Sequence, residues 1–355
     1  MPRQLQAPPS QLVVDGKLQL GTYDRPFERL NALDANISAP VRWPTALKRL
    51  RLKEWQAFQF GNRRIFGMVA LFNAKVLALV QVKVYDRVRQ RKILYETKVL
   101  PWTLALPNTL LDSDVCYQRR GCRVTFRNRL HDGHGEIDFD ISRGVRRPSL
   151  SARLTAFAGR AQPMVVCQPF GRGRGMYSHK GLMPAEGQLR IGDEEIPFDR
   201  TDSHVLMDDH KGFYPYVMKW DWVTAAGRDD AGRLVGLNLT RNQCTDPERY
   251  NENGFWVDGR LHLLPPVRMV REPARRWRLS GRGQAETWRV ADDAGQVDLR
   301  FDVHVGGRVD VNAIVVRSKY RGPFGTFNGR LTAKDGQSLD VRDLFGMGED
   351  FYLRC

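Results

Sequence analysis

The feature that most constrains the fold of this chain is a regular alternation of short strand-like runs and turn residues. Residues 123–130 and 136–141 alternate apolar and polar side chains, and they flank the turn-forming stretch His131-Asp-Gly-His-Gly135. A period of two places the apolar side chains on one face of an extended strand. We therefore predict a β-hairpin with one apolar face and one wet face.

The same pattern recurs through the second half of the chain. The runs at 218–223 and 234–240, 287–290 and 297–303, and 329–332 and 338–341 each flank a Gly- or Asp-containing loop. Residues 255–257 and 261–264 flank Asp258-Gly259, a dipeptide typical of a type I′ turn. Turns about every 8–12 residues are typical of antiparallel sandwiches and barrels. The fold class predicted is all-β.

A few segments depart from this alternation. Residues 65–84 form a nearly continuous apolar run, which we interpret as two core strands joined near Asn73-Ala74. A single buried helix is the alternative, and the frequent valines count against it. Helical structure is expected only around Thr45–Lys53 and as a turn near Leu344–Asp350.

The length of 355 residues suggests two domains. The Pro- and Gly-rich stretch 160–184 is the best candidate for a crossover between them. We expect an N-terminal β domain over residues 1–165 and a C-terminal β domain over residues 166–355, each an antiparallel barrel or sandwich with few short helices, because such closure leaves no long exposed edge.

Cysteine usage and the N-terminus bear on the compartment. The five cysteines are an odd number and include no C-x-x-C pair, so a disulfide scaffold is not expected. The first residues lack the apolar core of a signal peptide, and polar residues interrupt the most apolar stretch. We expect a soluble cytoplasmic protein.

The charge is strongly basic, at +16 with a pI near 9.9. Such a balance suits nucleic acid or an anionic membrane. The arginines, however, are scattered singly or in pairs along the whole chain. We expect a solvated basic surface and no specific nucleic acid partner, with peripheral contact to an anionic membrane as an alternative. The oligomeric state is left open.

Motifs for common cofactors and nucleophiles are missing from the sequence. It contains no G-x-S-x-G, no G-x-x-x-x-G-K-[ST] and no H-E-x-x-H. The glycine-rich run at 171–175 lacks dinucleotide spacing. We expect no cofactor and no metal, although His204, Asp208 and His210 leave a metal site open as an alternative.

One segment, residues 206–256, is dense in chemically capable side chains. Asp208, Asp209 and His210 are the candidate catalytic residues. A carboxyl group beside tryptophan in an apolar cavity has its pKa raised by desolvation, so it can act as a general acid. The imidazole of His210 can shuttle a proton or orient that carboxyl group.

The same segment supplies candidate ligand-binding residues, which combine aromatic rings with polar groups as ligand pockets do. On a strand, Trp220 and Trp222 share one face and Lys219 lies on the other. The alternative is ordinary core tryptophans and a polar turn. The candidates are Tyr214, Tyr216, Lys219, Trp220, Trp222, Asn238, Asn253 and Trp256.

The stretches 207–222, 236–243, 250–259 and 261–266 resemble the bacterial family called domain of unknown function 2804. So do residues 21–26 with Asn31, and the closing stretches 325–329 and 346–349. More distantly, the order of acid-His, Gly, aromatic-x-Trp and a strand is similar to the lipocalin-like group that contains hydroxyneurosporene synthase, a carotenoid hydratase, and tocopherol cyclase. The resemblance implies two successive lipocalin-like barrels that hold an apolar ligand at or between them. It also implies that Asp208 or Asp209 is the acid and that Trp220 and Trp222 line the wall.

Together these observations predict a protein that binds a hydrophobic small molecule, lipid or isoprenoid-like. If it is an enzyme, we expect acid-catalysed hydration, cyclisation or isomerisation, with Asp209 as the acid and His210 as its partner. A non-enzymatic carrier and a basic surface-binding protein are the alternatives.

Overall fold

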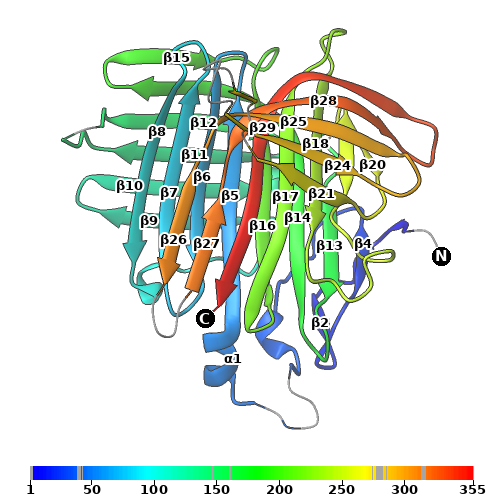
Figure 1. The fold of residues 1–355 in the computed structure, drawn as a ribbon. Helices are drawn as coiled ribbons and strands as arrows, with labels where there is room; N and C mark the ends of the chain where they lie inside the picture. Colours follow the sequence, from blue (N-terminus) through cyan, green and yellow to red (C-terminus); the bar gives the residue numbers. More distant parts are fainter. Residues whose placement is uncertain are drawn as a thin grey trace. The chain divides into compact units, whose positions relative to one another are not determined.

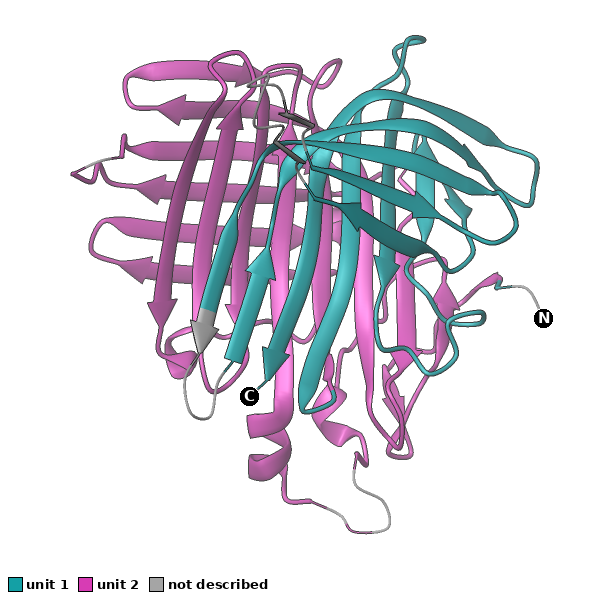
Figure 2. Ribbon diagram, viewed as in Figure 1, with its two compact units in different colours: residues 1–3, 215–355 teal, residues 4–214 magenta. Residues whose placement is uncertain are grey.

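The computed structural model describes residues 3–37, 41, 43–145, 147–159, 161–273, 275–276, 283–284, 286–312 and 317–354. The chain divides into two compact units: residues 4–214, here the N-terminal unit, and residues 1–3 with 215–355, here the C-terminal unit (Figure 2). The boundary predicted from the sequence is 165/166 instead. The division lies later because residues 164–213 pair with strands that precede them.

The N-terminal unit is built on a sheet of 14 strands among the described residues. The main path runs β8-β7-β6-β5-β16-β14-β12-β11-β10-β9, and β1, β4, β13 and β15 pair beside it, while β2 and β3 form a separate hairpin. The bounds are β1 (Leu5–Gln6), β2 (Val13–Val14), β3 (Lys17–Leu18), β4 (Gly21–Tyr23), β5 (Leu52–Gly61), β6 (Ile65–Asn73), β7 (Ala78–Asp86), β8 (Arg91–Val99), β9 (Ser113–Arg119), β10 (Cys122–Arg129), β11 (His134–Ile141), β12 (Leu150–Phe157), β13 (Met164–Pro169), β14 (Gly175–Ile191), β15 (Glu194–Phe198) and β16 (His204–Phe213).

Helical structure in this unit is short. The α-helix α1 (Thr45–Arg51) ends directly at the start of β5, and the 3₁₀ turns are η1 (Ala32–Asp34), η2 (Pro101–Thr103) and η3 (Leu130–Asp132). The helix expected around Thr45–Lys53 is thus confirmed, two residues shorter than predicted.

The sheet curls because its longest strand belongs to two parts of it. The first part of β14 pairs with β16, up to Pro184, and the part from Ala185 onward pairs with β12. Gly187 lies beyond this change with φ +133°, and a Cβ there would be 2.0 Å from the Arg153 carbonyl oxygen. Figure 1 shows the result, with β9–β12 running crosswise to β5–β8.

The C-terminal unit is built on an 11-stranded sheet in the order β20-β19-β18-β17-β29-β28-β25-β24-β21, with β26 and β27 paired beside it. β22 and β23 form a separate pair. The bounds are β17 (Val217–Arg228), β18 (Leu234–Arg241), β19 (Gly254–Val257), β20 (Arg260–Leu263), β21 (Arg268–Glu272), β22 (Arg275–Arg276), β23 (Gly283–Gln284), β24 (Thr287–Ala291), β25 (Val297–Val305), β26 (Arg308–Asn312), β27 (Arg317–Arg321), β28 (Phe324–Thr332) and β29 (Ser338–Arg354).

This second sheet changes partners along its longest strand in a similar way. The first part of β29 pairs with β28, and its last part pairs with β17 and β27. Gly329 in β28 has φ +138°, and a Cβ there would be 2.1 Å from the Asp298 carbonyl oxygen. Both sheets therefore contain a glycine whose neighbouring strand leaves no room for a side chain.

Each unit has its own hydrophobic core, built from one face of alternating strands. In β10, Val124 and Phe126 are buried, whereas Arg123 is exposed. In β25, Leu299 and Phe301 are 1% and 0% exposed. In these strands the apolar residues of the alternating sequence pattern face the core, and the polar residues between them face solvent.

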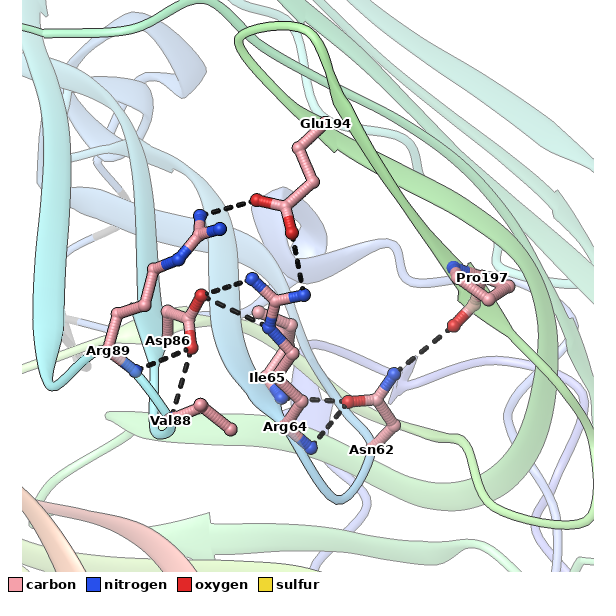
Figure 3. A network of polar contacts seen from close by, with 8 residues as sticks. All are labelled: Asn62, Arg64, Ile65, Asp86, Val88, Arg89, Glu194 and Pro197. Carbon is pink, nitrogen blue, oxygen red and sulfur yellow. Dashed lines mark hydrogen bonds and ion pairs between the residues drawn. The ribbon is translucent and has the colours of Figure 1, made fainter.

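A polar network ties distant parts of the N-terminal sheet together (Figure 3). Arg64 lies 2.6 Å from Asp86 and 2.8 Å from Glu194. Asn62 donates a hydrogen bond to the Pro197 carbonyl oxygen at 3.3 Å. The β5–β6 connection is therefore bound both to the end of β7 and to β15, across the curl of the sheet.

The prediction of an all-β protein of two consecutive antiparallel β-domains with few short helices is confirmed. Every hairpin expected from the alternation is present, and β6 and β7 are the two strands predicted within residues 65–84. Asp258 and Gly259 have φ of +46° and +81°, as a type I′ turn requires.

Two local expectations are wrong. The stretch predicted as a crossover is not one over its described residues 161–184, because β13 and the whole first part of β14 lie within it and are paired strands. Residues 344–350 are not a helical turn but part of β29, in which residues 344–349 are all buried. Burial on both faces of that strand removes the alternation by which it could be recognised.

The described part of the chain contains no helix that is both long enough and apolar enough to span a membrane.

Candidate functional site

The candidate catalytic residues lie on β16, which pairs with β14 on one side and β5 on the other. All residues of this strand are buried. Strand alternation places Asp208 and His210 on one face and Asp209 on the opposite face. The face of Asp209 also carries Val205 and Met207, which belong to the hydrophobic core. We call it the interior face, and the other the His210 face.

On the His210 face, polar groups from β14 surround the imidazole. Lys180 Nζ donates hydrogen bonds to Asp208 Oδ1 and, at 2.7 Å, to His210 Nε2. The same imidazole nitrogen lies 2.8 Å from Asp208 Oδ1 and 3.3 Å from Ser178 Oγ. Lys180, Asp208 and His210 are only 2%, 6% and 5% exposed. A cation and a carboxylate are therefore held together with little access to water.

These contacts keep Asp208 ionised. Burial acts to raise the pKa of its carboxyl group, but Lys180 and His210 hold that pKa well below its usual value. A carboxylate in this state accepts hydrogen bonds and stabilises positive charge, but it has no proton to donate.

The other imidazole nitrogen faces Tyr214. The Tyr214 hydroxyl lies 3.4 Å from His210 Nδ1, and Met176 Sδ lies 2.8 Å from the same nitrogen. The Tyr214 hydroxyl donates to Met176 Sδ at 2.5 Å. His210 Nε2 therefore lies within hydrogen-bond distance of both the Lys180 ammonium, which can only donate, and the Asp208 carboxylate, which can only accept. A chain of polar contacts thus runs from Tyr214 through His210 to Lys180 and Asp208.

Aromatic rings lie beside this chain. The Trp55 ring from β5 stacks on the His210 ring, with centroids 4.2 Å apart and planes 17° apart. It also lies 5.8 Å from the Tyr214 ring and 5.8 Å from the Phe72 ring. Phe170 lies 5.1 Å from Tyr214. An aromatic wall beside a few convergent polar groups is the composition of a small-molecule site.

Asp209 has the opposite environment on the interior face. Burial raises the pKa of its carboxyl group to about 8, against the effect of Lys211. Its Oδ1 has no hydrogen-bond partner in the described part of the chain. His179 is its register partner on β14, and burial lowers the pKa of that imidazole to about 3. The Tyr177 hydroxyl lies 3.2 Å from His179 Nδ1. At neutral pH, Asp209 is largely a neutral carboxylic acid beside a neutral imidazole.

The structure therefore brings three predicted residues together, Asp208, His210 and Tyr214, and places Asp209 elsewhere. The pairing of Asp209 with His210 is not what the geometry provides, because neighbouring residues of a strand point to opposite faces. The carboxyl partner of His210 is Asp208.

The remaining ligand-binding candidates lie in the C-terminal unit. Trp222 Nε1 donates to Asn238 Oδ1 at 2.7 Å, and Asn238 Nδ2 donates to the Glu252 carbonyl oxygen at 2.6 Å. Asn253 accepts a hydrogen bond from the Thr240 amide at 2.6 Å and donates to the Pro265 carbonyl oxygen at 2.8 Å. These contacts hold the loop before β19 against β17 and β18.

The other candidates in that unit differ in exposure. Trp220 stacks on Phe351, with ring centroids 3.9 Å apart, and its Nε1 donates to Glu349 at 3.2 Å. Trp256 is fully buried, Tyr216 is 53% exposed, and Lys219 is an exposed residue whose Nζ lies 5.5 Å from the Tyr352 ring.

Sequence reasoning missed the residues that β5 and β14 contribute. Trp55 follows a segment predicted as helix, and Met176, Ser178 and Lys180 lie within the predicted crossover. No apolar–polar alternation marks this strand, because Ser178, His179 and Lys180 are all polar. Nothing local could have shown that β5 pairs with β16.

Within the described ranges, no three His, Cys, Asp or Glu side chains are grouped so that they could hold a metal ion. The alternative of a metal site at His204, Asp208 and His210 has no such arrangement to support it.

Solved structures with a similar fold include a putative AttH from Nitrosomonas europaea, at 13% identity and a TM-score of 0.52, covering 89% of this chain and 98% of that one. Kievitone hydratase from Nectria haematococca (10% identity, TM-score 0.47, 85% of this chain and 87% of that one) and CghA (9%, 0.48, 86% and 88%) are also similar. The similarity to AttH is one of fold.

No curated protein matches the sequence. A family model does match, over residues 3–354, and it is described as Domain of unknown function (DUF2804). The match covers nearly the whole chain and confirms the resemblance carried by the motifs around β16 to β19. The chain belongs to the DUF2804 family.

Proposed function

We propose that the protein binds a hydrophobic small molecule, lipid or isoprenoid-like, against the His210 face of the N-terminal unit, and that it moves a proton on that molecule. The observation that carries this proposal is the direct contact between an aromatic wall and a buried polar chain. Trp55 stacks on His210, and His210 contacts both the Tyr214 hydroxyl and the Lys180–Asp208 pair.

In the proposed chemistry, the Tyr214 hydroxyl gives its proton to the bound molecule, His210 passes a proton to the tyrosinate oxygen, and the Lys180 ammonium supplies a proton to His210. When the molecule later loses a proton, the relay runs in reverse and restores all three groups. Positive charge that develops on the molecule is stabilised by the ring face of Trp55 and the carboxylate of Asp208. Water is scarce at this depth, so both effects are stronger than in bulk solvent. Hydration, cyclisation and isomerisation are the reactions that such a proton transfer serves.

A second arrangement uses Asp209 as the acid. Two neighbouring carboxyl groups whose surroundings push their pKa values apart are a recurring sign of divided acid and base roles. Asp209 keeps its proton near neutral pH, and one of its oxygens lacks a partner in the described part of the chain. In this arrangement the molecule lies on the interior face, next to Tyr177 and His179.

The test is to extract the apolar molecules that co-purify with the protein from one expression host and to measure their masses by mass spectrometry. The variants are Trp55→Ala, Tyr214→Phe and Asp209→Asn, with Tyr250→Phe as the matched control. Affinity is measured separately with a dansyl-labelled fatty acid. If Tyr214 acts on the molecule, Y214F still binds it but holds the unconverted substrate. Compared with the compound in the wild type, that substrate is lighter by one water for a hydration and is an isomer for the other reactions.

The two arrangements give different results. Loss of conversion in D209N but not in Y214F assigns the acid to the interior face. The same compound in wild type, Y214F and D209N, with weaker dansyl binding in W55A, identifies a carrier without chemistry. Absence of any bound compound, together with dansyl binding that W55A leaves unchanged, overturns the proposal.

A further inference from the structure

Three connections lie at one end of the N-terminal sheet: the one from α1 into β5, the one between β6 and β7, and the one from β8 into η2. The register pairs Glu54 with Asn73, Asn73 with Ala78, and Ala78 with Val99. The start of β5, the β6–β7 connection and the end of β8 therefore lie at the same end of the sheet. Because α1 leads into β5 and η2 follows β8, both lie at this end, and Figure 1 shows α1 beyond the strand ends.

This end carries large apolar side chains that are exposed. None of the residues of α1 is buried. Three strand spacings of ~4.8 Å place α1 and η2 about 14 Å apart. The exposed side chains are Trp43 (39%), Leu47 (48%), Leu50 (55%), Val76 (56%), Leu100 (54%) and Trp102 (78%). We call these six residues the docking end.

The charges beside the docking end are mainly positive. Arg49 on α1 and Lys98 on β8 are exposed. The carboxylate of Glu54, at the same end, is buried and bound to Lys75 and Lys211. Exposed tryptophan and leucine next to cations is the composition of segments that lie in the headgroup region of a membrane.

We propose that the docking end binds the surface of an anionic lipid bilayer, with its apolar side chains inserted among the headgroups and Arg49 and Lys98 facing lipid phosphates. A membrane fits this end because the apolar residues come from separate connections and a short helix and are accompanied by cations. None of these residues contributes to the His210 face, so this proposal does not depend on the proposed function.

The experiment is co-sedimentation of the full chain with vesicles. One set contains phosphatidylcholine alone, and the other contains phosphatidylcholine with phosphatidylglycerol. Wild type is expected to sediment with the mixed vesicles at physiological salt and much less with the neutral ones. Replacing Leu100 and Trp102 by Ser is expected to lower the partition coefficient by about tenfold or more, because two buried side chains are lost from the membrane.

A matched control comes from the opposite end of the same sheet. Val88, between β7 and β8, is 75% exposed, so V88S changes an equally accessible apolar residue away from the docking end and is expected to sediment like wild type. The variant R49Q/K98Q is expected to lose the preference for phosphatidylglycerol. Circular dichroism shows whether each variant is folded.

Three outcomes overturn the proposal. The first is wild type that does not sediment with the mixed vesicles. The second is an equal loss in V88S and in L100S/W102S. The third is self-association without vesicles that L100S/W102S abolishes, which identifies a second copy of the chain as the occupant. None of these depends on whether a small molecule is bound at the His210 face.

Discussion

Asp208 and Asp209 differ by one position in the chain, yet their surroundings give them opposite protonation states. Asp208 faces an ammonium and an imidazole, and Asp209 faces a core in which its Oδ1 finds no partner among the described residues. The alternation of a single strand is enough to separate them. At the scale of the residue, the chemistry available to the protein is therefore decided by which way each side chain points.

The first prediction concerns Asp209 and pH. Because its pKa is higher in the folded state, near 8, than the ordinary 3.8, the stability that protonation confers is complete below about pH 4 and is lost as the pH rises toward 8. In Asp209→Asn this dependence disappears. Urea unfolding between pH 5 and pH 8 should show the wild type losing up to about 1.4 kcal/mol per pH unit relative to the variant.

Asp140, an exposed aspartate on β11 of the same unit, provides the control. Asp140→Asn should keep the wild-type slope. Parallel curves for wild type and D209N would mean that the Asp209 carboxyl group is ionised throughout this range.

The second prediction concerns the buried ion pair. Lys180→Met leaves the Asp208 carboxylate in a buried site without its cation, which should lower the free energy of unfolding by roughly 3–5 kcal/mol. The double variant K180M/D208N removes both charges and should be more stable than K180M. Chemical denaturation of the two variants measures the difference, and a double variant less stable than K180M would show that the carboxylate is adequately stabilised by other groups.

At the scale of the element, the two longest strands shape the sheets. β14 and β29 each change partners along their length, and each sheet contains a glycine, Gly187 or Gly329, pressed against the carbonyl of the neighbouring strand. A side chain at either position would overlap that carbonyl oxygen, and the residue would need a positive φ that is unfavourable for any residue except glycine.

The third prediction follows from this geometry. Gly187→Ala and Gly329→Ala should each destabilise the protein by about 1–3 kcal/mol or more, because the backbone must move to accommodate a Cβ. Gly159→Ala and Gly306→Ala are the controls, since a Cβ at these positions meets nothing within 4 Å. Thermal unfolding of the four variants tests the prediction, which fails if the two pairs show the same loss.

How much could be predicted from the sequence depends on the distance between partners in the chain. The hairpins β10–β11 and β19–β20 were recognisable because alternation and turn residues are local, down to the positive φ of Asp258 and Gly259. Asp208 and His210 were recognisable as members of a polar run, but the run predicted Asp209 rather than Asp208 as the partner of His210.

The contributions of Trp55 and Lys180 were not recognisable. Trp55 reaches His210 only through the pairing of β5 with β16, whose two strands are far apart in sequence. Lys180 lies in a stretch whose prolines and glycines suggested a loop, although its backbone partners on β13 and β16 make it a strand. Which strands pair over a long sequence distance cannot be predicted from the local pattern of apolar and polar residues.

At the scale of the whole molecule, the excess of basic residues is distributed. The chain carries +16, yet many arginines on the sheet surfaces are matched by carboxylates across the strands, as in Arg127–Glu136, Arg190–Glu195 and Arg289–Asp298. Such pairs neutralise the surface locally and contribute little stability each. The net charge therefore does not by itself define a binding surface.

The fourth prediction tests this distribution. The protein should bind heparin at low salt and elute before about 0.15 M ionic strength, because dispersed charges are screened over about 8 Å. Retention that persists above this ionic strength would reveal a concentrated polyanion site. Since heparin has no apolar phase, this measurement also separates simple charge attraction from binding at the docking end.

The pairing of β16 with both β5 and β14 has a consequence for biosynthesis. The strand that carries Asp208 and His210 is the last of the N-terminal unit to leave the ribosome, and its partner β5 is made long before it. Until β16 is synthesised, the backbone hydrogen-bonding groups on one edge of β5 have no partner strand. Folding of this unit therefore depends on slow pairing between strands far apart in sequence rather than on fast local hairpin formation. Chaperone dependence of the N-terminal unit should therefore end when residue 213 emerges, whereas β17 still lacks its partner β29 at that point.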